Sequence, residues 1–260
     1  MKLRIITYII LTALITGTVN AMSLTQQADS AYMQDNFAKA TELYLKIAEE
    51  EGTSANLYYN IGNCYFRQGK PGMAILYYER ALRLDPSDKD ARANLEFVNT
   101  KITDEPGDRG MFISNTVNGF ACKISANIWA GIAIGSFILL LGAIALYVFT
   151  SAISLRKAGF FGGIVLLFIC ICANICASIA TRYSTSGKEA VITVPSTLLS
   201  TSPRIPKDRS EEAVLLHEGT KVEILDSVTT RTDSAVTKWY DVKIDNNTRA
   251  WIKGSDIEKI

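Results

Sequence analysis

Two long uncharged stretches in the middle of the chain limit most strongly what it can fold into. Residues 124–155 contain no charged side chain, and after Arg156 and Lys157 a second uncharged stretch covers residues 158–181. A helix of roughly 20 apolar residues is long enough to cross a bilayer. The sequence therefore predicts a membrane hairpin. Its segments are transmembrane helices at 128–149 and 158–180 and a cytoplasmic loop at 150–157.

The first 21 residues have the pattern of a signal peptide. Lys2 and Arg4 precede an apolar run, and residues 19–21 (Val-Asn-Ala) have the small side chains of a cleavage site. Whether the segment is cleaved or stays as an anchor, the following domain is exported. The two cations of the connecting loop agree with the positive-inside rule. We therefore expect a membrane protein with both soluble modules outside the cytoplasm.

Charge and residue usage argue against several function classes. The net charge is +1, which gives no electrostatic reason to expect nucleic-acid binding. His217 is the only histidine, so most His-based catalytic or metal sites are excluded. We expect no catalytic residues, no metal site and no cofactor, and hence a protein that is not an enzyme.

The five cysteines do not suggest a disulfide framework. Cys170, Cys172 and Cys176 fall in the second apolar stretch, where we interpret them as small apolar filler rather than metal ligands. Cys64 and Cys122 remain, without a C-x-x-C motif.

Residues 55–88 carry the pattern of a tetratricopeptide repeat, W-x2-L-G-x2-Y…A-x3-F…P, with Tyr58 in place of Trp. Small residues at Gly62, Ala74 and Ala81 would let two antiparallel helices approach closely. A weaker unit in the same register covers residues 24–47, and residues 88–102 look like a capping helix. The sequence therefore predicts an all-α solenoid domain at 22–102.

The concave face of such a solenoid binds peptide or protein segments. In the second repeat the register assigns four residues to this groove: Tyr59, Asn63, Phe66 and Arg67. The equivalent positions of the capping helix are Asp90, Ala93 and Phe97. An alternative interpretation is that some of these residues are ordinary solvated surface.

Between the repeats and the first apolar stretch, residues 103–127 are expected to form a linker and an interfacial segment. Glycine pairs spaced four apart, Gly131 with Gly135 and Gly159 with Gly163, would permit close helix contact in the hairpin. Neither stretch contains an Asp, Glu, Lys or Arg, which disfavours a transport pathway.

Residues 188–260 change to β-propensity, with five short strand candidates separated by turn signals. The candidates are residues 191–194, 213–216, 221–225, 239–244 and 248–252. This pattern predicts a small all-β barrel. The segments LHEGTKVEIL (216–225), WYDVKI (239–244), RAWI (249–252) and IEKI (257–260) are similar to bacterial SH3 domains. Trp239 and Tyr240 are either a candidate ligand face or part of the core. Trp251 is expected in the core, and His217 is expected to be structural.

The order of these parts resembles the BatE family of Bacteroides aerotolerance proteins over nearly the whole chain. The residues that carry the resemblance are YYNIGNCYFRQG (58–69), AILYYERALRLDP (74–86), SANIW (125–129) and LLHEGTKVEI (215–224). The resemblance implies an exported protein of the bacterial inner membrane, with both soluble modules in the periplasm. It also implies an envelope complex with von Willebrand A-domain membrane proteins and, indirectly, a MoxR-type ATPase. It also implies a role in oxygen or stress tolerance, and it supplies no catalytic residues.

Three hypotheses follow. The leading one is a non-enzymatic scaffold that holds envelope proteins. The second is a peptidoglycan-binding protein that acts through the SH3-like domain. The third is a redox role, for which Cys64 and Cys122 are the candidates outside the apolar stretches.

Overall fold

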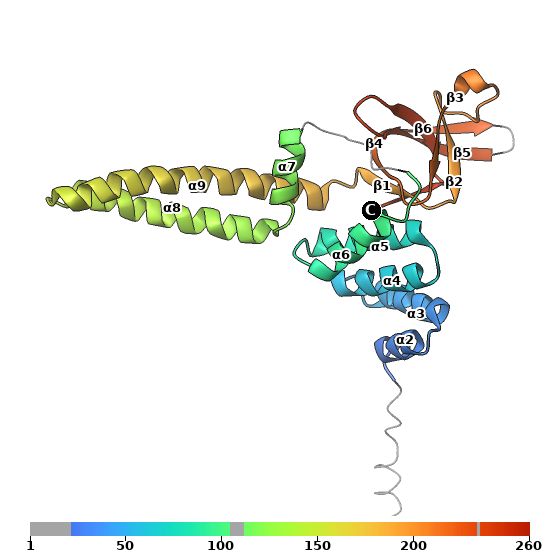
Figure 1. Ribbon diagram of the computed structural model, residues 1–260, viewed down its shortest axis with the longest axis horizontal. Coiled ribbons are helices and arrows are strands. Elements are labelled where there is room, and N and C mark those ends of the chain that lie inside the picture. Colours follow the sequence, from blue (N-terminus) through green and yellow to red (C-terminus); the bar gives the residue numbers. More distant parts are fainter. Residues whose placement is uncertain (1–21, 105–111, 233–234) are drawn as a thin grey trace, which may run out of the picture. The chain divides into compact units, whose positions relative to one another are not determined.

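The computed structural model describes residues 22–104, 112–232 and 235–260 (Figure 1). The predicted signal peptide at 1–21 lies outside the described residues. The chain contains a helical region, two long apolar helices and a curled antiparallel sheet of seven strands. It divides into two compact units, Met1–Gly52 and Thr53–Ile260.

The described part of the first unit is a helical hairpin of α2 (Leu24–Met33) and α3 (Phe37–Glu50). Ser23 and Gln26 form a capping box at the start of α2, and Asn36 caps α3 through the amide of Lys39. Small residues, Ala28 and Ala40, are fully buried. This hairpin coincides with the weaker repeat unit that the sequence predicts.

The second unit begins with α4 (Ala55–Arg67), α5 (Pro71–Leu84) and α6 (Lys89–Asn99). Gly62 lies against the ring of Tyr78, and a Cβ at Gly62 would be only 2.7 Å from that ring. The predicted close approach of α4 and α5 therefore depends on this glycine. Pro71 at the first helical position starts α5, where its missing N–H costs no hydrogen bond.

The apolar stretches form α8 (Ala126–Phe149) and α9 (Ile153–Thr185), which pack antiparallel and are preceded by α7 (Phe112–Ala121). Both long helices are long and apolar enough to cross a membrane. Gly159 and Gly163 of α9 lie at the contact with α8, whereas a Cβ added at Gly131 or Gly135 would have no neighbouring atom within 4 Å. Only the second glycine pair therefore serves the helix contact.

Helix α9 already begins at Ile153, within the segment 150–157 that the sequence assigns to the cytoplasmic loop. The connection is only residues 150–152, and Arg156 and Lys157 lie in the first turns of the helix. No Gly or Pro separates Ile153 from Ala158, and Leu, Arg, Lys and Ala are all good helix formers, so the helix extends past the charged pair. At its other end α9 continues beyond residue 180 to Thr185.

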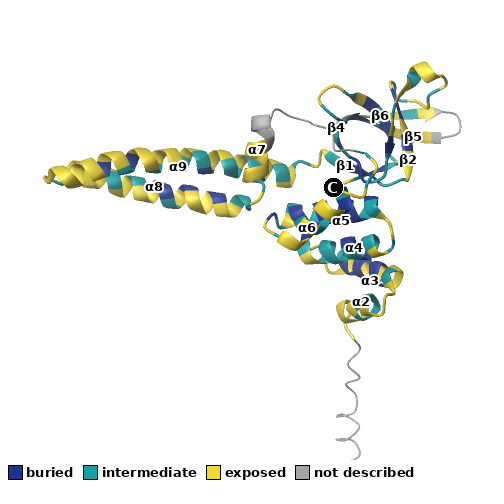
Figure 2. Ribbon diagram, in the orientation of Figure 1, coloured by how far each residue is buried: buried dark blue, intermediate teal, exposed yellow. Residues whose placement is uncertain are grey.

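The remaining residues form an antiparallel sheet in the order β3-β2-β6-β5-β4-β1-β7. The strands are β1 (Glu189–Ile192), β2 (Ser196–Ser200), β3 (Glu212–His217), β4 (Lys221–Thr232), β5 (Ala235–Lys243), β6 (Arg249–Lys253) and β7 (Ile257–Lys259). A 3-10 turn, η1 (Arg209–Glu211), precedes β3. The sheet curls around a core of aliphatic side chains that includes Ile192, Leu199, Val222, Val242 and Ile252. Buried residues follow this core in Figure 2, whereas α8 and α9 are largely exposed.

The sequence predicts five strands, and the structure has seven. The two missed strands are β2, which lies between Pro195 and Pro203 and is rich in serine, and β7, which is only three residues long. Strands β4 and β5 are also longer than predicted. The added part of β4 is mostly Thr, Ser, Asp and Arg, and the added part of β5 is residues 235–238 (Ala-Val-Thr-Lys), so no alternation of apolar residues marked either one.

Candidate functional site

One face of the second repeat carries a connected row of polar side chains. The Oδ1 atom of Asn63 on α4 accepts hydrogen bonds from the hydroxyl of Tyr78 on α5 (2.7 Å) and from Nδ2 of Asn94 on α6 (3.0 Å). Nδ2 of Asn94 also lies 3.4 Å from the hydroxyl oxygen of Tyr59. The Oδ1 atom of Asn63 accepts hydrogen bonds from side chains of two other helices. It therefore holds α4, α5 and α6 together at this face.

Aromatic side chains continue the same face. The rings of Phe66 on α4 and Phe97 on α6 meet edge to face, with centroids 5.8 Å apart. Phe97 remains 52% exposed, and the ammonium of Lys101 lies 5.2 Å from its ring centroid. We call this surface the α4/α6 face. Its members are Tyr59, Asn63, Phe66, Asn94 and Phe97.

Three of the four residues predicted for the groove, Tyr59, Asn63 and Phe66, are members of this face. The fourth, Arg67, is exposed at the end of α4. Asn94 was missed, because it lies one residue after Ala93, the position that the repeat register assigns to the groove. Its hydrogen bond to Asn63 depends on how α6 packs, which the register does not specify.

The candidate ligand face on the sheet is not one surface. Trp239 and Tyr240 are consecutive residues of β5, and consecutive side chains of a strand point to opposite faces. Trp239 is 3% exposed and donates its indole N–H to the hydroxyl of Thr230 (3.1 Å). Tyr240 packs partly against the core of the sheet. The two rings therefore do not form one exposed surface, and the burial of Trp239 agrees with the alternative that it is a core residue.

Trp251 also differs from its prediction. On β6 the core takes Ala250 and Ile252, so the alternation of the strand turns Trp251 to the other face, where it is half-buried. The sequence showed that both tryptophans lie on strands but not which face each strand buries.

Charged residues of α5 contact other elements of the same unit. Glu79 is only 6% exposed, and its carboxylate accepts hydrogen bonds from Nζ of Lys221 on β4 (3.0 Å) and from the hydroxyl of Tyr183 on α9 (3.1 Å). The same ammonium lies 3.5 Å from the carboxylate of Glu189 on β1. One buried carboxylate therefore links the repeat, an apolar helix and the sheet.

Two arginines extend this contact along α5. Arg80 donates to Oε1 of Glu258 (2.8 Å) and to the carbonyl of Lys259 (2.6 Å). Arg83 donates to the carbonyl of Ile260 (2.7 Å) and to the carboxylate of Glu189 (3.3 Å). Burial, partly offset by the nearby Arg80 guanidinium, raises the pKa of Tyr77 to about 12.

A third contact involves the turn before β4. The carboxylate of Asp104 accepts hydrogen bonds from the backbone N–H of His217 (2.7 Å) and the hydroxyl of Thr220 (2.6 Å), and it lies 2.8 Å from Nδ1 of His217. Burial alone would raise the pKa of Asp104, but the hydrogen bonds from Thr220 and His217 lower it below its usual value. This contact gives a physical basis for the predicted structural role of His217.

Gly219 lets this turn approach the helices closely. Its φ of +89° favours glycine, and a Cβ there would lie 2.6 Å from Cγ2 of Ile102 and 2.9 Å from Cδ1 of Ile75. We call the contacts of Glu79, Arg80, Arg83, Asp104 and Gly219 with the elements around them the α5 junction.

The surroundings of Cys64 and Cys122 do not favour a reactive thiolate. Cys64 is completely buried in α4. Burial, followed by the charge of Glu189, raises the pKa of the Cys122 thiol, which reduces its reactive thiolate fraction. In the part of the chain that the structure describes, no group of three or more His, Cys, Asp or Glu side chains is placed to hold a metal ion.

This geometry defines a helical-repeat module with an ordered, partly apolar face, which is the kind of surface that binds protein segments. The comparison with family models agrees: residues 55–88 match the tetratricopeptide repeat. No curated protein matches the sequence at a significant level. The chain therefore contains a tetratricopeptide repeat, at the position that the sequence pattern predicts.

Proposed function

We propose that the protein is a non-enzymatic scaffold or adaptor of the bacterial inner membrane, which holds a partner protein along the α4/α6 face. The proposal rests on the order and the exposure of that face. Asn63 and Asn94 are already ordered by their mutual hydrogen bond, and Phe97 remains half exposed beside them. A partner would meet a preorganised surface, which lowers the entropic cost of binding.

The exposure of the two apolar helices supports membrane anchoring. In their most apolar windows only 11% of α8 and 17% of α9 is buried, although a core helix of a soluble protein would be mostly buried. Apolar surface of this extent needs a cover, and lipid is the cover that suits helices of this length. Since α8 and α9 are antiparallel, the hairpin returns the chain to the side from which it came. We assign that side to the periplasm.

The proposed family is that of the BatE aerotolerance proteins. The repeat, the apolar hairpin and the C-terminal β module occur in the order that this resemblance requires, and a curled antiparallel sheet is compatible with an SH3-like barrel. The partners that the resemblance implies are von Willebrand A-domain membrane proteins, with a MoxR-type ATPase reached through them. The biological role would be tolerance of oxygen or related stress.

In-cell crosslinking followed by affinity purification and mass spectrometry tests this proposal. The informative variant combines Phe97→Ser with Arg67→Gln, because both side chains are exposed and can be replaced without opening the core. The matched control makes the same kind of change on the β module, Ile205→Ser with Arg209→Gln, also at exposed positions. We expect the first variant to lose membrane-protein partners that the control retains. Full retention of every partner by both variants would contradict the proposal.

Binding of peptidoglycan through the β module is the second candidate function. The ammonium groups of Lys238 and Lys259 lie 5.0 and 5.3 Å from the ring centroid of Tyr240. An aromatic ring between two cations suits the carboxylates and sugar faces of murein. Co-sedimentation of the full-length protein with murein, compared between the wild type and Tyr240→Ala, tests this function. Equal sedimentation, or none above a denatured control, would remove it.

A further inference from the structure

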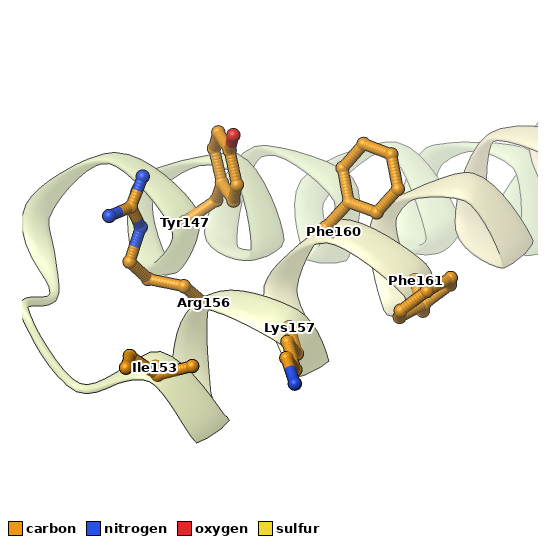
Figure 3. Close-up of a pocket in the computed structure, with 6 residues that line it drawn as sticks. All are labelled: Tyr147, Ile153, Arg156, Lys157, Phe160 and Phe161. Atoms are coloured by element: carbon orange, nitrogen blue, oxygen red, sulfur yellow. The ribbon is translucent and has the colours of Figure 1, made fainter.

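A small open pocket lies at one end of the apolar hairpin, where α8 ends and α9 begins. Its volume is about 330 Å³, and Figure 3 shows the six side chains that line it: Tyr147, Ile153, Arg156, Lys157, Phe160 and Phe161. The guanidinium carbon of Arg156 lies 5.3 Å from the centroid of the Tyr147 ring. The pocket thus combines two cations with mainly apolar walls.

The packing of the hairpin brings the two sides of this pocket together. A Cβ at Gly159 would lie 2.8 Å from the carbonyl oxygen of Ala143 and 3.0 Å from the backbone nitrogen of Tyr147. Since glycine has no side chain there, the two backbones come close enough for Arg156 of α9 to reach the ring of Tyr147 on α8. The guanidinium is therefore held in place by a contact between helices.

The cations of the pocket have no carboxylate to neutralise them. The sequence contains no Asp or Glu from residue 109 to residue 188. Among the ion pairs of the described residues, none involves Arg156 or Lys157. Ala152 precedes α9 without a side-chain cap, so the first backbone N–H groups of this helix add positive partial charge at the same end.

We propose that this pocket binds the phosphate group of an anionic phospholipid, with an acyl chain lying against Phe160 and Phe161. The inference rests on the membrane insertion of the hairpin in the proposed function. A helix of 24 residues such as α8 is about 36 Å long, so its ends reach the headgroup level of a bilayer about 30 Å thick. Two uncompensated cations above apolar walls match a phosphodiester above its acyl chains.

The test uses the full-length protein in nanodiscs that contain phosphatidylcholine with a minor fraction of phosphatidylglycerol. Native mass spectrometry of protein released from the discs measures how strongly phosphatidylglycerol is enriched among the retained lipids. We expect the enrichment to fall about fivefold in Arg156→Gln or Lys157→Gln and about 30-fold in the double variant. Tyr147→Leu, which removes the ring beside the guanidinium, should reduce it less.

The matched control is Lys123→Gln with Arg182→Gln, which removes two cations near the other end of the hairpin. It should leave the enrichment unchanged, and equal losses in both double variants, or no loss in either, would overturn the inference. An excess of soluble glycerol phosphate distinguishes the source of the phosphate. Displacement of the lipid by this soluble anion would show that the pocket binds phosphate from solution and would overturn the lipid assignment.

Alkaline carbonate extraction of cell membranes separates this inference from the proposed function. Wild-type protein that resists extraction but shows no enrichment of phosphatidylglycerol would overturn the lipid site and leave the membrane anchor standing. Release of the wild-type protein by carbonate would contradict the anchor itself, and with it the lipid site.

Discussion

The α4/α6 face and the α5 junction belong to the same repeat, and both carry polar and charged residues, but they meet different surroundings. On the α4/α6 face, Asn63 and Asn94 bind each other and Phe97 remains half exposed. At the α5 junction, Glu79 is buried, and its partners come from a strand and from an apolar helix. The α4/α6 face is ordered and still accessible to a partner, whereas the α5 junction makes its contacts within the chain.

This difference shows how a repeat can serve two purposes at once. Residues of its first helix and of the following capping helix stay accessible to a partner, while its second helix fixes the β module and the end of α9. Variants on one side of the repeat can therefore be compared with variants on the other side.

The largest effect is expected from Gly219→Val. The substitution forces a β-branched residue into a positive φ and places atoms against Ile102 and Ile75, at a combined cost of about 3–5 kcal/mol. Gly69→Val is the matched control, because Gly69 has a φ of +70° but no atom within 4 Å of the added Cβ. Thermal unfolding in detergent, followed by tryptophan fluorescence, should show a clearly larger loss for Gly219→Val. Equal losses would mean that the turn does not pack against the helices.

The next effect concerns Glu79. Glu79→Gln removes the 3.0 Å ion pair between Glu79 and the Lys221 ammonium, and we expect the free energy of unfolding to fall by about 2 kcal/mol. This is less than for a fully buried pair, because Lys221 is 28% exposed. The exposed Glu96→Gln should change stability by less than about 0.5 kcal/mol.

A double variant sharpens this result. Adding Lys221→Met to Glu79→Gln should recover part of the lost stability, because the ammonium that has lost the Glu79 carboxylate is then removed as well. A purely additive loss in denaturant unfolding would show that the two charges are not coupled.

Acid should weaken the Asp104 contact. The folded protein holds the pKa of Asp104 below its usual value of 3.8, so its contribution is fully present above that pH and is lost as the pH falls through the lower folded pKa. The contribution at neutral pH is expected to be about 1 kcal/mol. Unfolding measured from pH 7 down to pH 2 should show wild type and Asp104→Asn converging at the acid end. A constant difference across this range would contradict the assignment.

The smallest effect on stability is expected on the open face. Phe97→Ser removes a ring that is 52% exposed, and we expect a loss of only about 0.5 kcal/mol. The same substitution should nevertheless weaken binding of the partner protein. The variants at the α5 junction do not alter the α4/α6 face directly. A large drop in melting temperature would show that the phenyl ring of Phe97 belongs to the packed core rather than to a binding surface.

Regular spacing explains what could be predicted from the sequence. The pairing of Gly62 with Tyr78 and the placement of Tyr59, Asn63 and Phe66 follow from the 34-residue repeat, in which each position has a fixed environment. By contrast, nothing in the local pattern distinguishes Glu79, Arg80 and Arg83 from the solvated charges of any amphipathic helix. Their partners lie more than 100 residues further along the chain.

The sequence by itself determined the order of the parts, because periodicity, apolar length and β-propensity are local properties. It specified one tetratricopeptide repeat, two apolar helices and a β-rich C-terminal region. The tertiary structure alone decided that Trp239 and Tyr240 face opposite ways, that Asn94 joins the α4/α6 face, and that α5 contacts the sheet. These outcomes depend on strand register and on contacts between distant segments. Neither can be inferred from a local stretch of sequence.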